Sequence, residues 1–169
     1  MNTKLFSPFR LRDLDIPNRI MVSPMGQYSA VDGCVGDWHM MHLGNMAISG
    51  AGMLVIEATA INPVARLSHG DCGLWNDAQE AALAPILDFC RRVGGARIGM
   101  QLWHAGRKSS VTVAWERQQA IPPEAGGWTP LGADDRPYPR RNTPKAMDAD
   151  DRQRILQDYV DATERANRL

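Results

Sequence analysis

The chain has 169 residues, of which 44% are hydrophobic and 22% are charged, an ordinary composition for one globular domain with a substantial core. Nineteen basic and nineteen acidic residues give a formal net charge of zero, which argues against nucleic-acid-binding and polybasic membrane-surface proteins. The longest apolar runs fall far short of the ~18 residues of a membrane span, and the N-terminal segment lacks the apolar core of a signal peptide.

The three cysteines are Cys34, Cys72 and Cys90. None belongs to a C-x-x-C pair, and an odd number fits a disulfide framework poorly. The cysteine content therefore predicts a reducing, cytoplasmic compartment.

Three short apolar segments are bounded by glycine or proline, at residues 19–25, 52–58 and 97–102. Their nearly continuous hydrophobicity is typical of strands buried on both faces, as in a parallel sheet. A helical pattern over 37–50 follows the first segment, with Asp37 as the predicted N-cap.

A second helix is predicted over 77–93, where Asp77 and Glu80 have the spacing of a capping box. Pro85 lies inside this pattern and is expected to kink or interrupt the helix, because proline lacks an amide donor.

A third helix is predicted over 148–169, opened by Asp148 and Asp151. Its expected apolar stripe consists of Ile155, Tyr159, Ala162, Ala166 and Leu169.

The predicted order is strand, helix, strand, helix, strand, long excursion, helix. Such βα repeats indicate an α/β fold with a parallel sheet and right-handed crossovers. No G-x-G-x-x-G motif or P-loop follows any predicted strand, which argues against a nucleotide-binding Rossmann fold. Three βα units leave an open sheet, whereas a closed (β/α)₈ barrel needs about 250 residues. We therefore predict one domain over 1–169 that is part of a TIM barrel or a half that requires a partner.

The excursion over 107–147 contains six of the eleven prolines and two tryptophans, Trp115 and Trp128. A connection this long is usually a functional loop or lid. A disordered insert is the alternative, and the tryptophans argue against it because disordered segments are poor in aromatic residues.

The residues at the three strand ends are mostly small, amide-bearing or aromatic. SPMGQY follows the first strand, EATA ends the second, and QLWHAGR ends the third. Loops at the carboxyl ends of parallel strands converge on one site, and these residue types suit a large, flat ligand with polar edges.

The segments NRIMVSPMGQYS, DWHMMHLGNMAISGAGMLVIEATAINP and GMQLWHAGRK resemble the N-terminal half of the old yellow enzymes, most closely the bacterial YqjM-like subclass. These are FMN-dependent NAD(P)H oxidoreductases that reduce activated C=C bonds, such as those of enals and enones. The resemblance runs from about Leu5 to Leu169 and implies half of an eight-stranded barrel with FMN at its C-terminal mouth.

The resemblance implies roles for eight residues. Those expected to bind FMN are Ser23, Pro24, Met25, Gly26, Ala58 and Gln101. Tyr28 and Trp103 are expected to bind the substrate, an unsaturated carbonyl compound, and NADPH or NADH is the expected hydride donor.

The chain departs from the family pattern at Gly26, where relatives carry Cys or Thr near the flavin. The family's substrate-anchoring histidine pair, proton-donating tyrosine, flavin-contacting arginine and phosphate-binding loops have no counterpart within 1–169. The sequence therefore predicts no catalytic residue in this chain, and the expected partner is the C-terminal half of the barrel or a second copy.

Other residues have plainer interpretations. His39 and His42 are three apart on a predicted helix, but no third metal ligand is evident, so no metal site is predicted. His104 and Arg107 are expected to be structural.

Alternative hypotheses are an inactive fragment that needs a complementary half to bind flavin, and a half-barrel isomerase or aldolase. The latter lacks a strand-end lysine and a glycine-rich phosphate loop.

Overall fold

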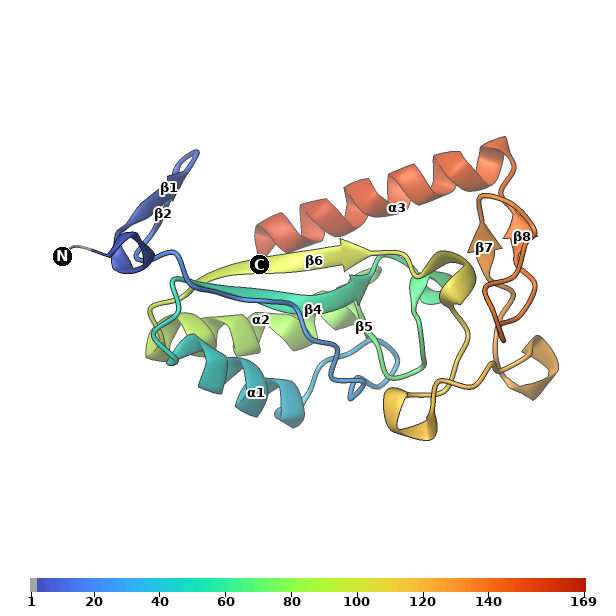
Figure 1. Cartoon of the computed structure of the whole chain (residues 1–169), viewed down its shortest axis with the longest axis horizontal. Helices are drawn as coiled ribbons and strands as arrows, with labels where there is room; N and C mark the ends of the chain where they lie inside the picture. Colours follow the sequence, from blue (N-terminus) through green and yellow to red (C-terminus); the bar gives the residue numbers. More distant parts are fainter. Residues whose placement is uncertain (1–2) are drawn as a thin grey trace.

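The computed structural model describes residues 3–169, so residues 1 and 2 of the predicted domain lie outside the described residues. Its elements follow the predicted order (Figure 1). The main strands are β3 (Met21–Val22), β4 (Met53–Ala60), β5 (Cys72–Gly73) and β6 (Arg97–Trp103). The α-helices are α1 (Asp37–Ala47), α2 (Asp77–Val93) and α3 (Ala149–Arg168).

β4 is the central strand of a parallel sheet. Its first residues pair with β3, its last residues pair with β5, and its whole length pairs with β6. The predicted strand over 19–25 is shorter in the structure, where the ladder includes only Met21 and Val22. Pro24 has no amide to donate to a ladder, which is consistent with an early end of the strand.

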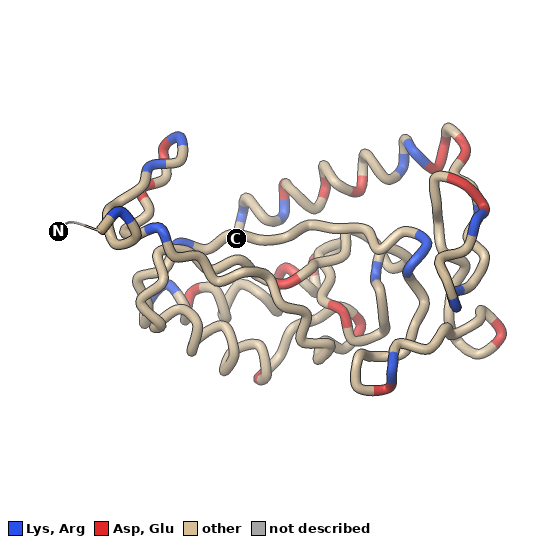
Figure 2. The backbone as a smooth tube through the Cα atoms, in the orientation of Figure 1, with Lys and Arg blue, Asp and Glu red and all other residues tan. Residues whose placement is uncertain are grey.

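The two faces of the sheet differ in what covers them. Leu54 and Ile56 of β4 pack in a core with residues of α1 and α2, including Leu43 and Leu83, and Ile98 of β6 packs against this core. On the opposite face, a β-carbon on Gly99 would lie 2.7 Å from Cε of Met53, so these two residues share that face. No helix within residues 3–169 covers it, and Figure 2 shows that charges are sparse along the central strands.

The first two helices begin at the predicted residues, but their N-caps are one residue earlier than predicted. The N-cap of α1 is Gly36, and Asp37 is the first helical residue. In α2, Asn76 and Gln79 form the capping box, so the predicted pair of Asp77 and Glu80 is wrong by one position. Asparagine caps helices as well as aspartate does, which makes adjacent Asn and Asp hard to rank from sequence.

α2 runs continuously through Pro85, so of the predicted kink or interruption the interruption is wrong. Pro85 and Ala81 are both exposed. Water can therefore solvate the Ala81 carbonyl, whose helical hydrogen bond the proline removes.

α3 begins as predicted, with a capping box between Asp148 and Asp151. Its apolar stripe packs as expected, since Ala162 is fully buried and Ile155 and Tyr159 lie against the same cluster. No helix in residues 3–169 has both the length and the hydropathy needed to cross a membrane.

An antiparallel hairpin of β1 (Phe9–Leu11) and β2 (Leu14–Ile16) precedes the sheet, near the amino ends of β4 and β6 (Figure 1). The first 3₁₀ turn, η1 (Lys4–Phe6), comes before the hairpin, and η2 (Pro63–Ala65) follows β4. The excursion lies at the other end of the sheet, where the parallel strands end.

The excursion is a packed segment and not a disordered insert. It contains three 3₁₀ turns and a two-stranded sheet: η3 (Gly106–Lys108), η4 (Ala114–Glu116), η5 (Pro123–Ala125), β7 (Leu131–Gly132) and β8 (Lys145–Ala146). The guanidinium of Arg66 lies over the rings of both Trp75 and Trp128, at 5.4 and 5.2 Å from the ring centroids. Trp128 also donates its indole N–H to the Val64 carbonyl at 3.1 Å. These contacts tie the excursion to the loop that follows β4.

Candidate functional site

A β-bulge brings Ala58 and Gln101 together at the carboxyl ends of β4 and β6. The register pairs Ile56 with Met100 and then Ala58 with Gln101, so Glu57 is the extra residue. The bulge therefore reverses the alternation of β4 and turns Ala58 to the face of the sheet that carries Gln101. Gln101 is exposed there and Ala58 is half-buried.

The four residues predicted to lie along a flat ligand follow β3 beside this pair. Ser23, Met25 and Gly26 are exposed, and Pro24 is half-buried. The next residue ties the segment to β4, because the Gln27 amide donates to Oε2 of Glu57 at 2.7 Å. The arrangement offers Ala58 and the Gln101 carboxamide on the uncovered face, with the mostly exposed residues 23–26 at the adjoining end of β3.

Glu57 is the centre of a buried polar network. His39, Glu57 and Cys72 have relative exposures of 1%, 5% and 1%. Nε2 of His39 lies 3.4 Å from Oε1 of Glu57 and 3.3 Å from Sγ of Cys72. Burial, with a contribution from the Glu57 carboxylate, raises the pKa of the Cys72 thiol well above its usual value, which keeps the thiol protonated.

These three side chains have the types and proximity of a metal site, but their protonation favours hydrogen bonding instead. The Gly36 amide donates to Nδ1 of His39 at 3.2 Å, so the proton of the neutral imidazole lies on Nε2. A protonated Nε2 donates toward Glu57 or Cys72 and has no lone pair for a cation. The network is therefore satisfied by its own members.

Tyr28 has an unusual backbone and several partners. Its φ is +51°, in the left-handed region that non-glycine residues rarely adopt. Gln118 donates from Nε2 to the phenol oxygen at 3.2 Å, and the Trp115 ring lies edge-on at 6.2 Å between centroids. Burial, together with the Asp71 carboxylate, raises the pKa of Tyr28, while the Gln118 hydrogen bond lowers it.

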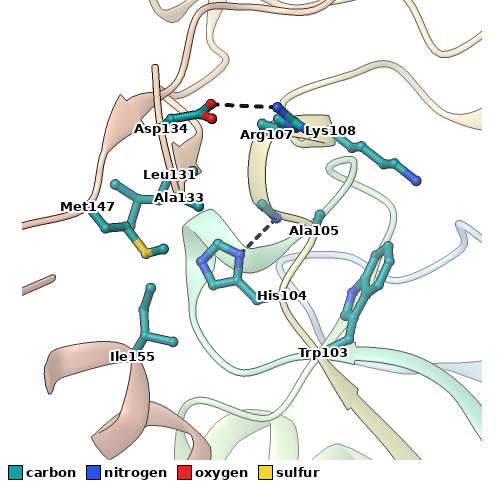
Figure 3. A pocket seen from close by; sticks show the side chains of 12 residues that line it. Trp103, His104, Ala105, Arg107, Lys108, Leu131, Ala133, Asp134, Met147 and Ile155 are labelled. Carbon is teal, nitrogen blue, oxygen red and sulfur yellow. Dashed lines mark hydrogen bonds and ion pairs between the residues drawn. The ribbon is translucent and has the colours of Figure 1, made fainter. Parts of the chain in front are cut away.

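Trp103 lines a different space, a cavity of about 550 Å³ between η3, β7 and the start of α3 (Figure 3). His104 lines it too and accepts from the Gly106 amide through Nδ1 at 2.9 Å. Its Nε2 and the Trp103 indole nitrogen are buried without a hydrogen-bond partner among residues 3–169. Burial lowers the pKa of His104, so the imidazole is neutral near pH 7. Arg107 and Asp134 pair across the rim at 3.6 Å.

Residues 4–168 match the profile of the NADH:flavin oxidoreductase / NADH oxidase family. The chain belongs to this family. An NADH:flavin oxidoreductase from Gibberella zeae is 37% identical over 99% of the chain and 41% of its own length. An NADPH dehydrogenase from Geobacillus thermodenitrificans is 37% identical over 99% of the chain and 46% of its own length.

Solved structures of flavin oxidoreductases share the fold. Morphinone reductase superposes with a TM-score of 0.82 at 29% identity, over 99% of this chain and 46% of the other. An old yellow enzyme homologue from Zymomonas mobilis gives 0.79 at 25% identity, over 97% of this chain and 45% of the other. These neighbours are TIM barrels of the old yellow enzyme type. The chain spans about half the length of the relatives it matches, and the prediction of half a TIM barrel is confirmed.

Two residues that contact the strand-end segments, Glu57 and Gln118, were assigned no role from the sequence. Glu57 had a visible signal, since it is the one charged residue in a largely apolar strand. Gln118 had none, because its contact with Tyr28 spans 90 positions and no local pattern predicts it. Trp103 and Tyr28 were both expected to bind the substrate, but Tyr28 does not line the cavity beside Trp103.

Proposed function

We propose that this chain forms one side of the FMN site of an NAD(P)H-dependent oxidoreductase that reduces C=C bonds conjugated to a carbonyl group. The observation that carries the proposal is the register of Ala58 with Gln101, on the uncovered face and beside residues 23–26. FMN is the cofactor of the family to which the chain belongs. One solved relative, morphinone reductase, forms a complex with tetrahydroNAD, which supports a nicotinamide as the hydride donor.

The residues present fit a flavin. A β-carbon on Gly26 would meet only the Tyr28 ring, at 3.5 Å, so the strand end leaves room for a planar ring system. In this proposal the residues that would hold the flavin are 23–26, through their backbone, together with Ala58 and Gln101. The Gln101 carboxamide would bind the polar edge of the ring system, because it can both donate and accept hydrogen bonds.

A bound flavin would supply the redox chemistry, hydride transfer between NADPH or NADH and the C=C bond of the substrate. This chain contributes binding and orientation. In this proposal Tyr28 donates a hydrogen bond that holds and polarises the substrate carbonyl, while Trp103 contributes to substrate binding from the neighbouring cavity between η3, β7 and α3. The excursion over 107–147 serves as a lid, and no residue of this chain is assigned as proton donor.

The remaining half of the site is proposed to come from a complementary part of a barrel or from a second copy. The coverage of 41% and 46% of two relatives supports this proposal. It equally favours a second candidate, a fragment that binds flavin only when its complement is present.

Free thiols at Cys34, Cys72 and Cys90 support a reducing, cytoplasmic setting.

The purified chain tests the proposal through its visible spectrum and its mass in solution. We expect flavin absorbance, together with a mass above the 18.7 kDa of one chain. Gln101→Leu should lower the flavin content, whereas Gln153→Leu, at an exposed position of α3, should not. A colourless species of single-chain mass would contradict binding by the chain as it stands and favour the fragment.

A further inference from the structure

The backbone of Tyr28 is held in its left-handed conformation by a close neighbour. A β-carbon on Gly70 would lie 2.4 Å from the Tyr28 carbonyl oxygen, so the two backbones are packed as tightly as glycine allows. The Ala30 amide donates to the Gly70 carbonyl at 3.0 Å and fixes the same approach. Strained residues of this kind cluster at binding sites, where the surrounding structure maintains them.

A turn over residues 112–119, which is part of the excursion, contacts the Tyr28 side chain and holds it in place. Thr112 organises this turn, since its hydroxyl donates to the Glu116 carbonyl at 3.1 Å and accepts from the Gln119 amide at 3.0 Å. Arg117 and Gln118 follow η4 with φ values of +68° and +49°. This turn presents the Gln118 amide group to the phenol and places Trp115 against the edge of its ring.

The direction of the Gln118 hydrogen bond determines what the phenol can do. Gln118 donates and the Tyr28 oxygen accepts, so the phenol proton remains free for another acceptor. Donation by an amide also polarises the phenol oxygen, which strengthens the phenol as a donor in turn. A carbonyl oxygen is the acceptor that this geometry suits.

We propose that Gln118 is a positioning residue that fixes Tyr28 as a hydrogen-bond donor to the substrate carbonyl, an inference that rests on the function proposed above. Gln118 does not touch the reacting atoms in this scheme. Gly26 completes the arrangement, because a β-carbon there would already be in van der Waals contact with the Tyr28 ring. The turn over 112–119 therefore gives the excursion a defined role in substrate specificity.

The contact itself is tested without flavin, by following the ultraviolet absorbance of tyrosinate against pH in the purified chain. The difference between the wild type and Tyr28→Phe assigns the Tyr28 titration among the three tyrosines. Gln118→Leu should raise the pKa of Tyr28 further, because the lost amide donor stabilises the phenolate. Gln119→Leu, at the exposed neighbouring position, should leave it unchanged, and circular dichroism should show that both variants fold.

The link to substrate is tested in the flavin-loaded protein with cyclohexenone and NADPH. Gln118→Leu should raise the KM for cyclohexenone about five- to tenfold at unchanged flavin content, the effect of about one hydrogen bond. An unchanged Tyr28 titration in Gln118→Leu overturns the proposal. A shifted titration with an unchanged KM overturns its link to substrate. Absence of flavin and of turnover in the wild type contradicts the proposed function instead, and the titration still decides whether Gln118 holds Tyr28.

Discussion

At the scale of single residues, some positions at the strand ends are constrained by close contacts and one, Gly26, is not. Glu57 satisfies the Gln27 amide from inside a β-bulge, and Tyr28 is wedged against Gly70. Gly26 directly precedes Gln27, but neither its backbone nor its neighbours require glycine. Its φ lies outside the left-handed region, and a β-carbon there would be at an ordinary contact distance of 3.5 Å from the Tyr28 ring. The fold therefore does not require glycine at this position.

Alanine substitutions at Gly26 and Gly70 should separate these two situations. Gly26→Ala is expected to be neutral or to stabilise the fold by up to about 0.5 kcal/mol, since alanine restricts the unfolded chain. Gly70→Ala is expected to cost roughly 1–3 kcal/mol, because its β-carbon would lie 2.4 Å from a backbone oxygen. Urea unfolding measures both free energies. Equal destabilisation by the two substitutions would show that Gly26 is also required by packing.

The same residues show how far sequence reasoning reaches. Small and amide-bearing residues at three strand ends are a local pattern, and that pattern predicted a site for a flat ligand there. The resemblance to the old yellow enzymes singled out Ala58 and Gln101, which the register pairs with each other. The bulge that makes them neighbours has no sequence signature beyond a lone glutamate in β4. The Gln118–Tyr28 contact depends on the path of a long excursion, which no periodicity encodes.

At the scale of elements, α2 and α3 are joined by a cluster of charges as well as by apolar packing. Arg168 donates to Glu80 from Nε at 2.8 Å and from Nη2 at 2.7 Å, and Arg165 donates to the same carboxylate at 3.0 Å. Arg165 also pairs with Asp77 at the start of α2. Glu80 was predicted to cap α2, but Gln79 has that role, which leaves Glu80 free to bind α3.

The α2–α3 pairing should make stability depend on pH in the acid range. The Arg168 hydrogen bonds, with those of Arg165, lower the pKa of Glu80 from 4.5 to about 2 in the folded chain. A carboxylate with a lowered folded pKa stabilises the fold above its unfolded pKa, and the contribution is lost as pH falls from about 4.5 to about 2. Glu80→Gln should therefore lower Tm at neutral pH, and the gap to the wild type should close over that range.

Thermal melts followed by circular dichroism across this pH range measure the gap. Glu124→Gln, an exposed substitution in η5, is the matched control and should show no such convergence. A constant difference in Tm between wild type and Glu80→Gln at all pH values would contradict an electrostatic origin.

At the scale of the whole molecule, the described chain leaves one sheet face and the outer edges of both β3 and β6 without partners. The face with Met53, Gly99 and Gln101 has no covering helix within residues 3–169, and β6 pairs only with β4 there. The periodicities of three strands and three helices predicted this half-barrel, because apolar runs and amphipathic stripes are local signals. The length of β3 and the N-caps of the first two helices were not predictable, since tertiary pairing and competing caps decide them.

Co-expression with a complementary half should cover the free edge of β6. The partner is the C-terminal portion of the Geobacillus thermodenitrificans NADPH dehydrogenase, the part outside its match to this chain. Every second amide of β6 faces away from β4 and should exchange quickly with deuterium in the chain alone. These amides should be protected once a neighbouring strand pairs with β6, while the amides of α2 should change little. Flavin absorbance should appear together with the protection, and Gln101→Leu should reduce the absorbance but not the protection. Slow exchange along β6 in the chain alone would mean that a second copy already covers this edge.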